Sequence, residues 1–151
     1  MTGFGQERKS NDRSKIDSLR KNSPDQLLSK AFKYHSEGNI EAAEKYYNLL
    51  IKKNYNDSRV YSNYGVICKQ SGRISKAISL YKKSINLFPN NPETYSNLGW
   101  IYKEQGLLKE AEIETIRAIE LDPNFSNAYL NLGSILKDQG RLEEAEQATY
   151  K

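Results

Sequence analysis

The sequence predicts an all-α solenoid, a row of helix–turn–helix repeats that pack on one another. Along the 151 residues, three residue types recur every 34 residues: Gly38, Gly72, Gly106 and Gly140; Ala43, Ala77, Ala111 and Ala145; and Tyr61, Tyr95 and Tyr129. A fixed period of this size is typical of repeat proteins, whose units bury their apolar faces against their neighbours. The period therefore defines both the fold class and the boundaries of the units.

The segment 92–125 shows the pattern most clearly. Two amphipathic helices are predicted in it, separated at Gly106 and followed by Pro123, because glycine reaches positive φ without strain and proline cannot continue a helix. The same division predicts a disordered polar and basic leader, a degenerate first repeat, two full repeats and a partial fourth, at residues 1–22, 23–57, 58–91, 92–125 and 126–151.

The order of the helices follows from the turn and cap residues. Ser23, Pro24 and Gln26 form a capping box that opens the first helix, and Asn91 with Pro92 opens the fifth. The expected helices cover 24–37, 40–53, 58–71, 74–87, 92–105, 108–121, 126–139 and 142–150.

Small residues are expected where the two helices of a unit pass closest. Gly65, Gly99 and Gly133 would face Ala77, Ala111 and Ala145, and larger side chains there would overpack at a typical cost of about 1–3 kcal/mol. The larger apolar residues expected in the interior are Tyr64, Leu98, Leu132, Ile74, Leu108, Leu142, Ile85, Ile119, Leu87 and Leu121.

These residues resemble the tetratricopeptide repeat, a 34-residue helical hairpin with an aromatic residue, Leu-Gly, tyrosine, glycine, alanine and proline in order. The third repeat supplies Tyr95, Leu98, Gly99, Tyr102, Gly106, Ala111, Ala118 and Pro123. The resemblance covers residues 24 to 151 and implies a right-handed α-solenoid. It also implies a concave groove, lined by the first helices, that binds a peptide or a helix of a partner protein.

Three rows of residues, each at the 34-residue step, are carried onto that groove. The first is Asn63, Asn97 and Asn131, with Ser29 in phase, and it resembles the asparagine ladder in the peptide-binding arm of O-linked N-acetylglucosamine transferases. An amide offers a donor and an acceptor to any peptide backbone. The second row places bulky apolar groups and the third lysines: Phe32, Val66, Trp100 and Ser134, then Lys69, Lys103 and Lys137 with His35 in phase. The alternatives are an inherited, unused ladder, packing of the aromatic groups against neighbouring first helices, and solvated lysines.

The carboxylate clamp of some family members needs lysine, asparagine and arginine at set groove positions. One register gives Leu28, Phe32, Asn63, Glu93 and Asn97, and the next gives Ser62, Val66, Asn97, Asn127 and Asn131, each with a single match. The groove is therefore not expected to bind chaperone C-terminal tails in that way.

Composition and charge limit the other functions. Residues 1–23 carry six basic and three acidic side chains, which leaves about +1 of the +4 net charge on the repeats, so nucleic acid is not expected as a partner. Neither an apolar run of the roughly 18 residues that span a bilayer nor a secretory signal is present, and a single cysteine suits the cytoplasm.

No enzymatic constellation is apparent, and we expect no catalysis, cofactor, metal or small-molecule substrate. His35, the only histidine, is expected to face solvent, and Cys68 is expected in the interior. The predicted function is a protein–protein interaction scaffold or adaptor. The alternatives are a substrate-recruiting arm of a larger enzyme such as a glycosyltransferase, and an RNA-binding array like the pentatricopeptide proteins. Because the fourth repeat stops at Lys151, its exposed face is expected to be covered by a partner or by another copy of the chain, or else the chain is the front of a longer, truncated protein; truncation is favoured over self-association.

Overall fold

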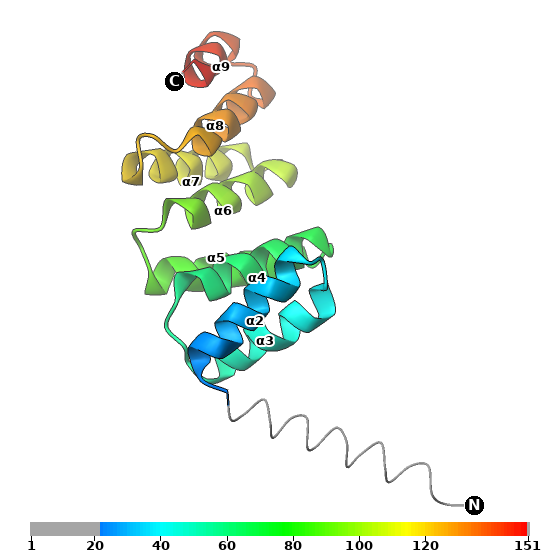
Figure 1. Ribbon diagram of the computed structural model, residues 1–151. Helices are drawn as coiled ribbons and strands as arrows, with labels where there is room; N and C mark the ends of the chain where they lie inside the picture. Colours follow the sequence, from blue (N-terminus) through cyan, green and yellow to red (C-terminus); the bar gives the residue numbers. More distant parts are fainter. Residues whose placement is uncertain (1–21, 151) are drawn as a thin grey trace, which may run out of the picture. The chain divides into compact units, whose positions relative to one another are not determined.

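The computed structural model describes residues 22–150, so the predicted disordered leader lies, apart from Asn22, outside the described residues. The described part of the chain contains eight helices and no strand (Figure 1). The predicted all-α solenoid is confirmed, and the expected helix ranges agree with the structure to within one residue. The helices are α2 Pro24–Ser36, α3 Ile40–Lys52, α4 Ser58–Gln70, α5 Ile74–Leu87, α6 Pro92–Glu104, α7 Leu108–Leu121, α8 Ser126–Asp138 and α9 Leu142–Thr149.

The chain divides into two compact units between Tyr55 and Asn56. The first contains the hairpin of α2 and α3. Its start is fixed as the sequence predicts, because the Ser23 hydroxyl accepts from the Gln26 backbone N–H at 3.3 Å and the Gln26 side chain accepts from the Ser23 N–H at 3.1 Å. Tyr55, which follows α3, joins the end of the hairpin to its start, because its hydroxyl donates to Oδ1 of Asp25 in the first turn of α2 at 2.6 Å.

The prediction that His35 faces solvent is wrong. Its ring is partly buried and meets the Tyr47 ring edge-on with 6.1 Å between centroids, while its Nδ1 lies 3.4 Å from the Tyr47 hydroxyl. The position lies late in α2, where the helix still packs on α3, and periodicity alone did not show that the fully buried Tyr47 would reach it.

This burial lowers the pKa of His35 below its usual value of 6.5. The folded state therefore takes up the proton less readily than the unfolded chain, so His35 contributes stability above pH 6.5 that is lost as the pH falls below it. We expect the single histidine resonance, followed by NMR against pH, to titrate with a midpoint below 6.5. A midpoint at or above that value would contradict the burial of the ring.

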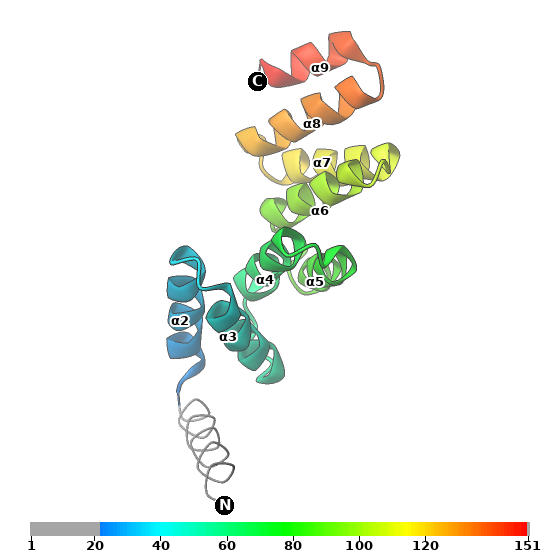
Figure 2. The ribbon, with the colours of Figure 1, turned by 90° about the vertical axis from the view of Figure 1, so that its right-hand side faces the viewer.

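The second unit contains three hairpins, α4–α5, α6–α7 and α8–α9 (Figure 2). Each helix contacts the next one along the chain, and α6 also contacts both α4 and α8. The first helices therefore form a continuous row, and this row carries the site described below.

The interhelix glycines behave as predicted, with φ between 72° and 79° at all four positions, which include Gly72 and Gly106. Glycine adopts this left-handed conformation after a helix without strain because it has no Cβ, and after α3 the same role falls to Asn54 with a φ of 52°. Asn91 occupies the N-cap position of α6 ahead of Pro92, but its side chain makes no capping hydrogen bond.

The close approach of paired helices is confirmed, but the side chain that fills it differs from the prediction. A Cβ on Gly99 would lie 2.4 Å from Thr115 Oγ1, and one on Gly65 would lie 2.5 Å from the Tyr81 ring. In two of the three pairs the alanine contributes its backbone carbonyl oxygen, that of Ala111 at 3.0 Å from the Cβ on Gly99 and that of Ala145 at 3.2 Å from a Cβ on Gly133. The residue one helical turn after the alanine is the one that meets the glycine.

Two leucines predicted in the interior are exposed. Leu87, the last residue of α5, is 40% exposed, and Leu142, in the first turn of α9, is 64% exposed. The equivalent of Leu142 in the preceding repeat, Leu108, is partly covered by the following repeat, whose Gln139 donates to its carbonyl at 3.3 Å.

Candidate functional site

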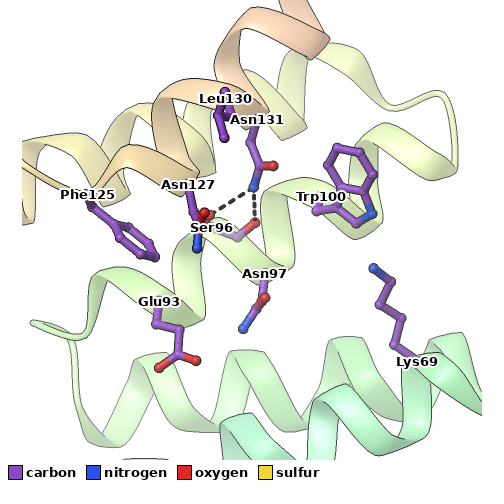
Figure 3. Close-up of a pocket in the computed structure, with 9 residues that line it drawn as sticks. All are labelled: Lys69, Glu93, Ser96, Asn97, Trp100, Phe125, Asn127, Leu130 and Asn131. Atoms are coloured by element: carbon purple, nitrogen blue, oxygen red, sulfur yellow. Dashed lines mark hydrogen bonds between the residues drawn. The ribbon is translucent and has the colours of Figure 1, made fainter. Parts of the chain in front are cut away.

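A pocket of about 420 Å³ opens along the row of first helices in the second unit (Figure 3). Helices α4, α6 and α8 and the residue that precedes α8 all contribute to it, and we call it the groove. Its lining residues are Lys69, Glu93, Ser96, Asn97, Trp100, Phe125, Asn127, Leu130 and Asn131.

Two members of the predicted asparagine row, Asn97 and Asn131, line the groove. The Asn131 amide donates to the Ser96 hydroxyl at 2.9 Å and approaches the Ser96 carbonyl at 3.5 Å, so it also ties α8 to α6 (Figure 3). Within residues 22–150 the half-buried Asn97 side chain makes no hydrogen bond, and its donor and acceptor remain available to a ligand. Asn63 lies half-buried on α4, outside the lining of this pocket.

Trp100 lies in the groove with two members of the lysine row beside its ring. Lys103 Nζ lies 4.8 Å and Lys69 Nζ 5.5 Å from the ring centroid, within the range of a cation–π contact. Both lysines also pair with an acidic residue of the next repeat, Lys69 with Glu104 at 3.7 Å and Lys103 with Asp138 at 3.1 Å. These pairs neutralise much of the predicted basic stripe, whereas Lys137 is exposed on α8.

The remaining predicted residues do not line the pocket. Val66 is half-buried on α4. Phe32 belongs to the first unit, where its ring lies 6.4 Å from that of Tyr47, centroid to centroid. Tyr47 lies on α3, the second helix of the same hairpin, so this contact is packing within the repeat and not the predicted alternative of packing against neighbouring first helices.

Sequence reasoning named Glu93 and Asn127 as groove positions of the clamp registers without assigning them to a row, and it did not place Ser96, Phe125 and Leu130 in the groove. Glu93 and Asn127 precede Asn97 and Asn131 by four residues, and residues at this spacing share one helix face. Leu130 is 58% exposed at the position where Ser62 and Ser96 are buried in earlier repeats.

Comparison with known proteins identifies the family. Models of the TPR repeat and the tetratricopeptide repeat match residues 65–106, 92–125 and 116–147, which together cover more than half of the chain. The chain is a tetratricopeptide repeat protein. No curated protein sequence matches it.

Solved structures are similar to this tetratricopeptide repeat protein in fold. MamA is 18% identical with a TM-score of 0.80, over 99% of this chain and 92% of MamA. An O-GlcNAc transferase mutant from Thermobaculum terrenum is 22% identical with a TM-score of 0.70, over 75% of this chain but only 22% of the transferase chain. The first TPR of Spaghetti, bound to the HSP90 peptide SRMEEVD, is 21% identical with a TM-score of 0.73, over 78% of this chain and 93% of that domain.

Two observations on this tetratricopeptide protein concern metal binding and thiol reactivity. No group of histidine, cysteine and acidic residues within residues 22–150 could hold a metal ion. Cys68 is buried, as predicted, and burial raises the pKa of its thiol, which disfavours the reactive thiolate. None of the described helices is both long and apolar enough to cross a membrane.

Proposed function

We propose that this tetratricopeptide protein is a scaffold or adaptor that binds an extended peptide of a partner protein in the groove. The observation that carries the proposal is that the Asn97 amide and the Trp100 ring both line one pocket. The amide would pair with the peptide backbone, and the ring would receive an apolar side chain.

The walls of the groove support an apolar anchor. Phe125 and the exposed Leu130 face the same space as Trp100, and about 420 Å³ accommodates one or two large side chains. The Asn131 oxygen remains an acceptor for a peptide N–H while its amide nitrogen donates to Ser96. We propose that Asn63, Val66 and the lysine row extend recognition beyond this pocket within the second unit, whereas a groove role for Phe32, in the first unit, stays a prediction.

The test is selection of random 12-residue peptides on the chain, followed by calorimetric titration of the enriched sequences. We expect Asn97→Ala and Trp100→Ala each to weaken binding by about tenfold, since each removes a central contact. Ile113→Ala, on α7 outside the groove, is the matched control and should bind as the parent does. Equal binding by all three variants would refute the groove proposal.

We further propose that the groove does not accept chaperone tails. Glu93 places a carboxylate in the pocket, and neither register supplies the basic pair that would hold a terminal carboxylate. The peptide SRMEEVD should therefore bind no more tightly with a free C-terminus than with an amidated one. A preference of tenfold or more for the free carboxylate would show that a clamp exists (about 1.4 kcal/mol).

The alternative is that the same groove recruits substrates for a larger enzyme. The fold similarity to part of the Thermobaculum terrenum O-GlcNAc transferase favours it. Sequencing the reading frame past Lys151 would decide between the two, because the alternative requires a catalytic domain in the same protein. Self-association through the last repeat, where Leu130 and Leu142 are exposed, a cytoplasmic location and the absence of nucleic-acid binding remain predictions.

A further inference from the structure

A second hollow, of about 290 Å³, lies on the opposite face of α8 from the groove. Its floor is apolar, its walls come from α7 and α9, and it shares no lining residue with the groove. We call it the cleft, and its lining residues are Glu112, Ile116, Tyr129, Leu132, Leu136, Arg141, Glu144, Gln147 and Ala148.

The repeat period supplies an internal reference for the cleft. One repeat earlier, the positions of Ile116, Leu136 and Ala148 are held by Lys82, Tyr102 and Glu114. There the Lys82 ammonium lies 5.9 Å from the centroid of the Tyr102 ring. Burial raises the pKa of the half-buried Glu114, and the nearby charge of Lys82 acts on this pKa in the opposite direction. The earlier position is thus occupied by polar side chains of the chain itself, whereas the cleft presents an isoleucine, a leucine and an alanine.

One end of the cleft is held rigid by a network around Arg141. This guanidinium donates to Glu112 at 2.7 Å and to Glu144 at 2.6 and 2.8 Å, and Gln139 donates to the other oxygen of Glu112 at 2.9 Å. The network joins α7 to the start of α9, so the two walls are fixed in position before any ligand binds. A preformed hollow costs less to occupy than one that must open.

The two helices that form the walls are strongly acidic, although only Glu112 and Glu144 of their glutamates line the cleft and both are bonded to Arg141. Helices α7 and α9 carry seven glutamates, Glu110, Glu112, Glu114, Glu120, Glu143, Glu144 and Glu146, against Lys109 and Arg117. Arg141 adds one positive charge beside them. The preceding second helix, α5, has the opposite character, with Lys76, Lys82 and Lys83 and no acidic residue.

We propose that the cleft is a second docking site, which takes a basic segment of a partner protein carrying one bulky apolar anchor. The anchor, a leucine or phenylalanine, fills the space above Leu136 and beside Ile116, which is 39% exposed. Lysines or arginines on either side of the anchor lie along the glutamates of α7 and α9. This site is independent of the groove, so the protein can hold two different segments at once.

The experiment uses the whole chain and three matched pools of labelled 12-residue peptides, followed by fluorescence anisotropy. The first pool has a central leucine or phenylalanine flanked by lysine and arginine, the second replaces the basic residues by glutamate, and the third replaces the anchor by alanine. We expect only the first pool to bind, with an affinity that falls as salt is raised. No binding by the first pool, or equal binding by the second, overturns the proposal.

A variant that copies the preceding repeat provides the decisive control. Ile116→Lys, Leu136→Tyr and Ala148→Glu together should close the cleft with residues that already pack in this fold, and weaken the first pool by at least about tenfold. Trp100→Ala should leave this binding unchanged, which separates the cleft from the groove. If circular dichroism shows that the triple variant is unfolded, Ile116→Lys alone, at a partly exposed position, must give the same direction of change. Unchanged binding in a folded variant overturns the proposal.

Discussion

Replacing Gly99 by alanine is expected to destabilise the second unit by about 1–3 kcal/mol. The added Cβ would lie 2.4 Å from Thr115 Oγ1 and 3.0 Å from the carbonyl oxygen of Ala111. The first contact can be relieved by rotation of a side chain, but the second is with backbone, so α6 and α7 must separate. Alanine favours a helix over glycine by up to about 1 kcal/mol, which reduces the loss without cancelling it. The measurement is the urea midpoint, followed by circular dichroism.

Two further variants distinguish overpacking from other causes. Thr115→Ala in the Gly99→Ala background removes the 2.4 Å contact and leaves the backbone contact, so it should restore only part of the midpoint. Gly106→Ala meets nothing within 4 Å but has a φ of 76°, and it should lose stability through backbone strain alone, by about 1–2 kcal/mol. A rise in the midpoint for Gly99→Ala would show that the helices are not in close contact there.

The helices could be predicted because each depends on local residues repeated in phase. Glycine at positive φ and proline at the first helical position act on the backbone next to them, so the end of α4 and the start and end of α6 follow from Gly72, Pro92 and Gly106. Because the same local residues recur in each repeat, a helix boundary predicted in one repeat also applies to the others. This explains why the predicted and observed helix ranges agree to within one residue.

The partners of individual side chains could not be predicted from the period. It correctly placed small residues at Gly65 and Gly99, yet which side chain meets them depends on how the second helix is rotated about its axis. The first unit shows this dependence, because Ala31 and Tyr47 occupy the positions of Gly65 and Tyr81 and are both fully buried. An alanine and a tyrosine therefore fit in one repeat, whereas a Cβ in the other would clash.

The groove was predicted in part for a related reason. Asn97, Asn131, Trp100 and Lys69 were found because they stand in rows at the repeat interval. Contacts that cross between repeats, such as Asn131 with Ser96 or Lys103 with Asp138, join positions 35 residues apart. They depend on side-chain length and on the stacking of successive hairpins, which no single row records.

Replacing Tyr81 by phenylalanine is expected to stabilise the second unit by about 0.5–1 kcal/mol. The Tyr81 side chain is fully buried, and its hydroxyl has no hydrogen-bond partner within the described residues. Burial raises the pKa of this hydroxyl well above its usual value of 10, so the hydroxyl stays protonated at neutral pH. Its O–H group loses its hydrogen bonds to water on folding and gains none in the protein, which destabilises the folded state. Phenylalanine keeps the ring that meets Gly65 and removes only the oxygen. The measurement is again the urea midpoint.

Tyr47 provides the matched control, because it holds the same position one repeat earlier. Its hydroxyl lies 3.4 Å from His35 Nδ1, so Tyr47→Phe should remove a contact and destabilise the first unit by about 0.5–1 kcal/mol. The two substitutions are chemically identical and both remove a hydroxyl from a fully buried tyrosine, yet they should have opposite signs. If both variants lose stability equally, the Tyr81 hydroxyl has a partner, such as a buried water, that offsets its burial. If both gain, the contact between Tyr47 and His35 contributes nothing to the stability of the first unit.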